Sequence, residues 1–417
     1  MNKQEFNEYK QKEMFKDGVK LGPSMILSKS LERPMYAKHV GNENVLVIGG
    51  AGSGKTKSVI IPNLLQMTGS YVVHDPGGEL YYQVGDVLRE YGYDVKVFDS
   101  LGSNVTCSYN PIKYISDEAD VHCIAECILQ KLEAEDVLWR KSQELFLCAC
   151  IYYLKNHCKE ESRKNLNSIL SIIKITNGKR ELLEELFENL PKESKAYQYY
   201  KAFSQASGLT YNHIIADLLI RFSQLLDEKV AALVTTDTLE LEKLNKEKTV
   251  IFIVTSAKDL IHNSLLFTTM LISQAYNVLA NSNTENKIPV TFILNEFEAL
   301  GKIPNIGMNM CVGRKFKLSY ITICMNLDLL NSVYGKDMNQ IIGNSSTLIH
   351  LGNANDVTTT EFFEKVIDKS DDYFKQSFRK MNQNNCLVAC TNHKPMIDKK
   401  YDLRKHPLYY KILEYNK

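Results

Sequence analysis

The sequence lacks the charge excess that a nucleic-acid-binding protein often carries. Its 417 residues include 50 Lys and Arg against 49 Asp and Glu, a formal net charge of +1 at pH 7. This balance excludes binding of nucleic acid through overall charge and leaves only local basic patches for such a partner. Hydrophobic residues at 44% and charged residues at 24% are ordinary for a soluble globular protein.

Paired cysteines and long apolar runs are also missing. The ten cysteines form no Cys-x-x-Cys pair and do not cluster with histidine, which excludes the common zinc-site patterns. No signal peptide is recognisable, so free thiols in a reducing cytosol are expected. The best candidate for a membrane span, residues 145–154, has about half of the roughly 18–20 apolar residues required. We therefore expect a soluble chain, with a removed or partner-supplied membrane anchor as an open alternative.

Short apolar segments with strand character occur in two parts of the chain. They alternate with helical patterns in the first hundred residues, and the same alternation returns after residue 240. Fully apolar strands separated by helices predict a parallel sheet covered on both faces. We therefore expect an α/β fold with one mostly parallel central sheet built from both parts. The predicted strands cover residues 44–49, 70–75, 94–99, 249–255, 289–294, 317–324 and 346–351.

Residues 116–240, between these two parts, show helical spacing and almost no strand signal. A block of this length is too long for a loop, so we expect an all-helical domain inserted into the α/β domain. The α/β domain would then comprise residues 1–115 and 241–417. The predicted helices cover residues 120–132, 136–156, 166–175, 181–190, 193–205 and 211–226.

The run Gly-Gly-Ala-Gly-Ser-Gly-Lys-Thr at residues 49–56 matches the G-x-x-x-x-G-K-[ST] pattern of a phosphate-binding loop. It follows an apolar strand and precedes a helical pattern, which is the context that the motif requires. Backbone N–H groups of such a loop and the start of the helix can surround a phosphate. Lys55 would bridge the β- and γ-phosphates, and Thr56 would give its hydroxyl oxygen to Mg²⁺. A glycine-rich turn that binds nothing is the alternative, which the eight matching positions disfavour.

Asn295 and Glu296 stand where a nucleotide-driven motor has two carboxylates at the end of a strand. The first carboxylate usually contacts Mg²⁺, and the second takes a proton from the attacking water. Glu296 retains the second role, whereas Asn295 offers a neutral oxygen that Mg²⁺ binds less well. We therefore expect nucleotide binding to persist and hydrolysis to be weak. Alternatively, these two residues end a strand without any metal role.

Together the ordered motifs, from about residue 42 to residue 406, resemble those of type IV secretion coupling proteins, the TraG/TraD class of FtsK-like motor ATPases. Besides the phosphate loop, the resemblance rests on "PNLLQMTGSYVVHDPGGELY", "SYNPIKYI", "TTDTLELEKL", "KTVIFIVTS", "NEFEALGKIPNI" and "YDLRKHP". It implies a RecA-like P-loop NTPase domain that is interrupted by an all-helical domain at which substrates dock.

The resemblance also implies cofactors and partners. Members of this family bind ATP, form hexameric rings, usually carry N-terminal transmembrane helices, and deliver DNA–relaxase complexes to a conjugation channel. We expect ATP and Mg²⁺ as cofactors, and single- or double-stranded DNA and relaxosome proteins as partners. A type IV secretion channel or a membrane-anchor protein would hold the chain at the cytoplasmic face of the bacterial membrane. We expect a homo-hexamer when assembled and weak self-association of the isolated chain.

The resemblance assigns a role to each candidate site residue. Lys55, Glu296 and Arg314 would act in catalysis, and Thr56 and Asn295 would hold Mg²⁺, weakly because of the amide. The contacts to the nucleotide would come from Gly49, Gly50, Ala51, Gly52, Ser53, Gly54, Lys55, Thr56, Lys57 and Asp75.

Arg314 lies where the family carries an arginine before a strand. In a ring it could reach the γ-phosphate of a neighbouring subunit, a device that contributes roughly 10³–10⁵ in rate. The alternative is a solvated basic turn shared with Lys315 and Lys317. Basic residues of this turn, or the tyrosine-rich residues 197–203, could face DNA. The sequence assigns no specific DNA-contacting residue.

Three departures from the family pattern divide the functional hypotheses. Asn295 replaces an Asp, Gly77 stands where a Lys is common, and Met325 stands where a phosphate-sensing Gln is expected. The first hypothesis is an ATP-powered translocation motor, and the second is a nucleotide-gated docking module that hydrolyses little. A small-molecule kinase is disfavoured because the helical insertion and the "YDLRKHP" segment have no role there.

Overall fold

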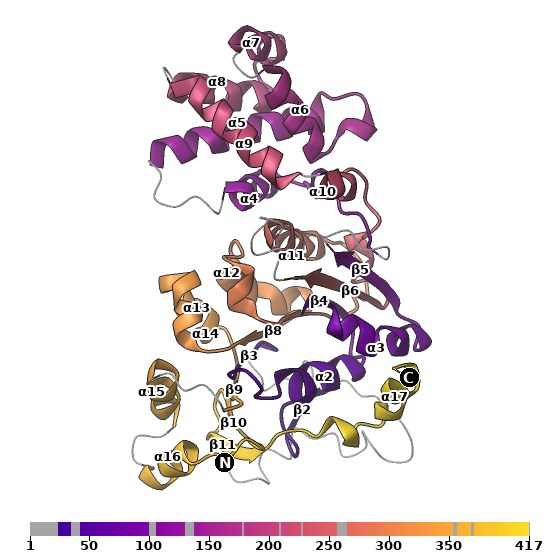
Figure 1. Ribbon diagram of the computed structural model, residues 1–417, viewed down its shortest axis with the longest axis vertical. Helices are drawn as coiled ribbons and strands as arrows, with labels where there is room; N and C mark the ends of the chain where they lie inside the picture. The colour runs from indigo at the N-terminus through magenta and orange to yellow at the C-terminus, as the bar shows by residue number, and fades with distance from the viewer. Residues whose placement is uncertain are drawn as a thin grey trace.

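The computed structural model shows an elongated molecule, with a block of helices at one end of its long axis and a sheet with covering helices in the rest (Figure 1). The described residues are 24–34, 42–99, 106–129, 137–176, 179–207, 210–226, 228–256, 265–352, 357–367 and 371–416.

Nine strands of the described residues form one sheet. They are β3 (Val45–Ile48), β4 (Ser70–Pro76), β5 (Asp94–Asp99), β6 (Thr249–Thr255), β7 (Val290–Leu294), β8 (Leu318–Cys324), β9 (Thr347–His350), β10 (Asn385–Cys390) and β11 (Met396–Lys399). Their order in the sheet is β11-β10-β9-β3-β8-β7-β4-β6-β5. The strands from β9 to β5 are parallel, and β10 and β11 add antiparallel strands at one edge.

This sheet confirms the predicted fold class, and all seven predicted strands are present in it. Strands from before residue 100 and after residue 240 lie side by side, as expected for one sheet. The prediction missed β10 and β11 at the edge. It also missed a short separate hairpin of β1 (Ser24–Ile26) and β2 (Glu32–Pro34).

Helices cover both faces of the sheet, because successive strand residues point to opposite sides. Val45 and Val47 of β3 pack in one core with η2 (Thr56–Ile60), α2 (Ile61–Leu65), α3 (Glu79–Glu90) and α17 (Tyr409–Tyr415). Leu46 and Ile48 pack in the other core with α11 (Leu265–Ala280), α12 (Ile306–Val312) and α13 (Leu327–Tyr334). All four β3 side chains are buried, which explains why this strand is apolar without alternation.

The predicted helical block lies in the connection between β5 and β6, which are neighbours in the sheet. The described residues of 116–240 contain helices and no strand, although the division into domains remains a prediction. Residues 130–132 and 136 of the predicted helices lie outside the described residues. The helices are α4 (Glu118–Leu129), α5 (Val137–Asn156), η4 (Glu161–Arg163), α6 (Leu166–Thr176), α7 (Arg180–Glu188), α8 (Lys195–Ser207), α9 (Tyr211–Leu225) and α10 (Glu228–Leu233).

Helix α4 joins this block to the sheet by packing on α11 (Figure 1). The side-chain amide of Asn277 on α11 donates to the carboxylate of Asp120 on α4 at 2.7 Å. Within the block, the rings of Phe187 and Tyr200 stack with centroids 4.6 Å apart. Aromatic packing of this kind gives the block a core of its own.

The remaining described elements lie around the sheet edges. The mostly polar residues 380–384 connect α16 to β10. Among the described residues, no helix combines the length and hydropathy that a membrane span requires. These elements are η3 (Pro111–Tyr114), η6 (Leu241–Lys243), η7 (Phe297–Leu300), η8 (Gly313–Phe316), η9 (Gly335–Asp337), α14 (Met338–Gly343), α15 (Val357–Val366), α16 (Asp372–Arg379) and η10 (Leu403–Lys405).

His406 follows η10 and should make folding sensitive to acid. Burial lowers its pKa from 6.5 to about 4, and its Nδ1 accepts the N–H of Leu408 at 3.1 Å. Below pH 6.5 this histidine therefore binds a proton in the unfolded chain but not in the folded chain. The free energy of unfolding thus falls as the pH drops toward 4. Between pH 7 and pH 5, we expect the free energy of unfolding to fall by about 2 kcal/mol more in the native chain than in His406→Asn.

Urea unfolding at the two pH values measures this difference. His213→Asn, which changes an exposed histidine, is the matched control and should retain the full acid sensitivity. Equal pH dependence of the native chain and His406→Asn would contradict the assignment.

Candidate functional site

The phosphate-binding loop at residues 49–56, called the glycine loop from here on, leaves β3 at the carboxyl ends of the parallel strands. The N–H of Gly49 donates to the carbonyl of Cys324, the last residue of β8, at 3.0 Å. The N–H of Gly50 donates to the carbonyl of Gly352, just after β9, at 3.3 Å. Both neighbouring strands therefore fix the start of the loop.

Two glycines in the loop are required by its conformation. Gly54 has φ +87°, a value that residues with a Cβ rarely adopt. A Cβ on Gly49 would lie 2.5 Å from the Ser53 Oγ and 2.9 Å from the Cβ of Leu351. The tight fold-back at Gly49 thus brings the loop against the end of β9.

Lys55 bridges the two ends of its own loop. Its Nζ donates to the carbonyls of Gly49 at 2.7 Å and Gly50 at 3.2 Å. Thr56 begins η2, a π-helical turn that continues directly into α2, and the exposed Lys57 follows it. The structure therefore brings the predicted loop residues together in one turn: Gly49, Gly50, Ala51, Gly52, Ser53, Gly54, Lys55, Thr56 and Lys57.

Asn295 and Glu296 follow β7, which is separated from β3 by β8 alone, or about 10 Å across the sheet. The carbonyl of Asn295 contacts His74 Nδ1 at 2.5 Å, and His74 Nε2 contacts the hydroxyl of Thr255 at 2.8 Å. This buried histidine fixes the backbone at the end of β7. Glu296 is exposed with φ +49°, while the Asn295 Oδ1 is buried without a hydrogen-bond partner among the described residues.

Glu298 in η7 is the site residue that sequence reasoning missed. Its Oε1 accepts the N–H of Met325 at 2.9 Å, and its Oε2 is buried without a hydrogen-bond partner among the described residues. Burial raises the pKa of Glu298, whereas the N–H donors of Glu298 and Met325 and the Lys55 ammonium lower it. The charge of Glu296 adds to the rise. Because Glu298 follows the end of β7 and contacts Met325 directly after β8, it lies at the same ends of the strands as the glycine loop.

Asp75 ends β4 at the same edge, but its carboxylate has another role. Its two oxygens accept the N–H groups of Leu80 at 3.0 Å and Tyr81 at 2.8 Å, at the start of α3. Burial raises its pKa to about 6 against the effect of these bonds. The carboxylate of Asp75, which the sequence assigned to the nucleotide, is thus already engaged in capping α3.

Arg314 lies in η8, just before the first residue of β8. It therefore lies at the amino ends of the strands, whereas the glycine loop lies at their carboxyl ends. The seven residues of β8 span about 20 Å. The structure therefore does not bring Arg314 to Lys55 or Glu296 of the same chain.

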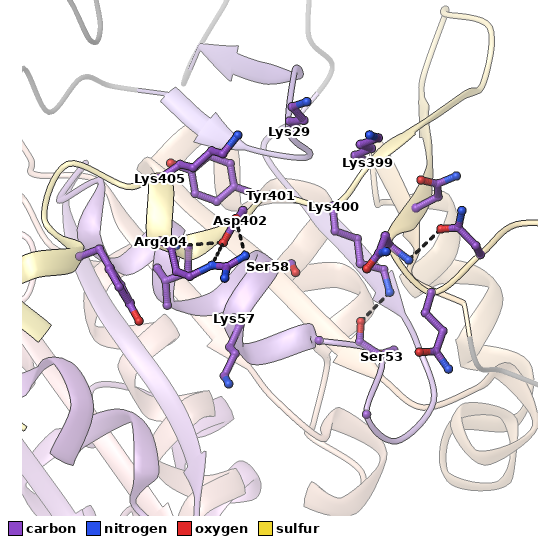
Figure 2. Close-up of a pocket in the computed structure, with 18 of the residues that line it drawn as sticks. Lys29, Ser53, Lys57, Ser58, Lys399, Lys400, Tyr401, Asp402, Arg404 and Lys405 are labelled. Atoms are coloured by element: carbon purple, nitrogen blue, oxygen red, sulfur yellow. Dashed lines mark hydrogen bonds and ion pairs between the residues drawn. The ribbon is translucent and has the colours of Figure 1, made fainter. Parts of the chain in front are cut away.

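A cavity of about 960 Å³ borders the loop (Figure 2). Its lining residues Lys400 and Tyr401 follow β11, which lies on the side of β3 away from β7 in the sheet order. The wall of the cavity includes Gly52, Ser53 and Gly54 of the loop, and Lys400 Nζ donates to the carbonyl of Ser53 at 2.7 Å. Burial raises the pKa of Tyr401 to about 12. The cationic lining residues are Lys29, Lys57, Lys399, Lys400, Arg404 and Lys405, against Asp402 as the acid among the described lining residues.

These features fit a nucleotide with a divalent cation. The described residues contain no group of three His, Cys, Asp or Glu that could hold a metal ion alone. Mg²⁺ is commonly bound with few protein ligands, several waters and phosphate oxygens. The Thr56 hydroxyl and the buried, unpaired oxygens of Asn295 and Glu298 would suit such a site, and the cationic cavity would suit the rest of an anionic ligand.

Comparisons with known proteins identify relatives over most of the chain. A family model described as type IV secretory system conjugative DNA transfer matches residues 2–389. The conjugal transfer protein TraG of Rhizobium radiobacter is 25% identical over 343 residues, covering 78% of this chain and 52% of TraG. VirD4 of Agrobacterium fabrum is 22% identical over 340 residues, covering 78% of this chain and 49% of VirD4. The chain thus spans about half the length of the curated relatives it matches.

Solved structures show the same fold at low identity. The plasmid coupling protein TrwB in complex with ADP and Mg²⁺ superposes with a TM-score of 0.66 at 14% identity, covering 91% of this chain and 89% of TrwB. VirB4 of Thermoanaerobacter pseudethanolicus superposes with a TM-score of 0.57 at 14% identity, covering 92% and 98%. These similarities confirm a P-loop NTPase fold.

The capping role of Asp75 is testable. Loss of a helix cap destabilises a protein by about 1 kcal/mol, so Asp75→Ala should lower the free energy of unfolding by that amount. Because both oxygens already bind backbone N–H groups, nucleotide affinity should change less than about twofold. Chemical unfolding and a fluorescent-nucleotide titration measure the two effects. Asp86→Ala, which removes an exposed carboxylate of α3, is the control. A large loss of nucleotide affinity at unchanged stability would instead make Asp75 a ligand.

Proposed function

Because the chain belongs to the family of type IV secretory system conjugative DNA transfer proteins, we propose that it is the ATP-binding part of a coupling protein. It recruits DNA–relaxase substrates and drives or gates their transfer into a type IV secretion channel during bacterial conjugation. The glycine loop beside the end of β7 is the observation that carries this proposal.

The nucleotide phosphates bind at the glycine loop. Lys55 would exchange its contacts with the carbonyls of Gly49 and Gly50 for phosphate oxygens, and the Thr56 hydroxyl would help to hold Mg²⁺. Mg²⁺, when bound, supplies positive charge that neutralises the phosphate oxygens. Asn295 would be a weak protein ligand of this ion, and Glu296 would accept the proton of the attacking water. The complex of TrwB with ADP and Mg²⁺ supports a nucleotide and Mg²⁺ as the bound groups.

The cationic cavity takes the ribose and base side of the nucleotide. It borders the glycine loop at Gly52, Ser53 and Gly54, so a nucleotide whose phosphates lie in the loop can extend into the cavity. Its volume of about 960 Å³ lies within the usual range of ligand pockets. Tyr401 offers an aromatic ring for the base, and Lys400 holds the loop from this side (Figure 2).

Assembly into a ring gives Arg314 a function. It lies at the edge of the sheet opposite its own glycine loop, so it suits the site of a neighbouring copy. A homo-hexamer therefore fits the site better than a single chain, and a membrane-anchor or channel partner holds the ring at the membrane. The helical block between β5 and β6 is the docking place for relaxase or DNA, because it stands away from the nucleotide site (Figure 1).

The second candidate function is a docking module that binds ATP and hydrolyses little. Asn295 and Met325 favour it, because Asn295 lacks the charge of the Asp, and Met325 the amide of the Gln, that the family pattern has at these positions. Nucleotide binding then serves to switch the recruitment of substrate.

Lys55→Ala tests nucleotide capture. Loss of a charged hydrogen-bonding partner should weaken binding of a fluorescent ATP analogue by about 10- to 100-fold, without loss of folding. Lys336→Ala, an exposed lysine on η9, is the control and should bind as the native chain does. Undiminished binding by Lys55→Ala would remove the glycine loop from the site.

Steady-state ATP hydrolysis, with and without DNA, separates the motor from the docking module. We expect slow turnover by the native chain and a severalfold higher kcat for Asn295→Asp, because a carboxylate makes roughly twofold stronger hydrogen bonds to metal-bound water than an amide. Glu296→Gln should abolish turnover and keep binding. Fast native turnover that Asn295→Asp leaves unchanged would contradict the assigned weakness of Asn295.

A further inference from the structure

Glu298 has no role assigned from the sequence, yet its carboxylate follows Asn295 by three residues at the end of β7. We propose that Glu298 supplies the negative charge that Asn295 lacks, and holds the water shell of Mg²⁺ at the glycine loop. This inference rests on the proposed function, since it concerns the ATP and Mg²⁺ of the same site.

The position of Glu298 is fixed from two sides. It stands in η7, directly after Asn295 and Glu296 at the end of β7. Its Oε1 accepts the N–H of Met325 at 2.9 Å, and the preceding residue, Cys324, accepts the N–H of Gly49. The carboxylate is therefore attached one residue away from the bond that anchors the glycine loop.

The surroundings of the second carboxylate oxygen of Glu298 favour a nearby cation. Oε2 is buried and has no hydrogen-bond partner among the described residues. An unpaired charged oxygen out of water is strongly unfavourable, so such groups are usually paired or face a cation. The ammonium of Lys55 acts on this carboxylate from the glycine loop, which places the phosphate-binding lysine within its electrostatic reach.

Asn295, three residues before Glu298, also lacks a hydrogen-bond donor for its buried side-chain oxygen among the described residues. Two acceptors cannot hydrogen-bond to each other, whereas a hydrated divalent cation presents water donors to both. An amide and a carboxylate then share the work that one Asp does at the end of β7 in the family pattern.

Glu298 is a positioning residue in this proposal, because it acts through metal-bound water. The competing explanation is a purely structural tie between η7 and the backbone of Met325. Glu298→Gln distinguishes the two, because the amide oxygen of Gln can still accept that N–H while the charge is lost.

The measurement is the affinity for a fluorescent ATP analogue with Mg²⁺ and with EDTA, in the full chain. The ratio of the two affinities isolates the metal contribution from folding and from nucleotide contacts. For Glu298→Gln, we expect this ratio to fall by at least about tenfold, as for other residues that orient metal-bound groups. The affinity in EDTA and the thermal midpoint should stay close to native values.

A double variant that moves the carboxylate from position 298 to position 295 completes the test. Asn295→Asp/Glu298→Gln should restore the native ratio, because the carboxylate returns to the other position. Glu285→Gln, an exposed carboxylate before β7, is the control and should leave the ratio unchanged. A native ratio in Glu298→Gln would overturn the proposal and leave Glu298 as a structural tie.

Asn295→Asp alone decides the question if Glu298→Gln fails to fold. Because Glu298 already supplies the charge for Mg²⁺ binding, the ratio should rise less than about threefold even where kcat rises, whereas a larger rise would show an uncompensated site. Absence of nucleotide binding in the native chain would contradict the proposed function itself. Normal binding with a ratio insensitive to Glu298 would contradict only this inference.

Discussion

The hydrogen bond from Gly49 to the last residue of β8 is the constraint on which the site depends. It fixes where the glycine loop leaves the sheet, and the parallel pairing of β3, β8 and β7 then brings the end of β7 beside that loop. Parallel strands present their carboxyl ends at one edge, so residues nearly 250 positions apart in sequence meet there. A single backbone contact thus links nucleotide capture to the residues that would handle metal and water.

The same edge has two chemically different sides. On one side of Lys55 lie Asn295, Glu296 and Glu298, which suit a hydrated cation and a water nucleophile. On the other side lies a cationic cavity around Lys400, which suits an anionic ligand.

Much of the fold was predictable, because its strands are buried on both faces. Segments such as residues 44–49 and 249–255 are apolar without alternation, which only a covered parallel sheet explains. β1, β2 and β11 escaped prediction because they are only three or four residues long, and β10 escaped because it also pairs with β9, about 40 residues earlier in the chain. The helical insertion was predictable from its spacing, whereas its packing of α4 on α11 was not.

The site was predictable as far as its motifs extend. The glycine loop follows from local sequence, since its glycines and Lys55 act within eight residues. The capping of α3 by Asp75 and the distance of Arg314 from its own loop depend on three-dimensional arrangement. Glu298 gave a faint signal, as a second glutamate two residues after Glu296, but only the fold shows that it contacts the end of β8.

Hydrogen–deuterium exchange, with and without ATP and Mg²⁺, tests the central claim most directly. Backbone amides of residues 49–56 and 295–298 should both gain protection when the nucleotide binds, while those of residues 313–317 in the isolated chain should not. Protection of the glycine loop without any change at residues 295–298 would contradict the claim that one nucleotide site joins the two.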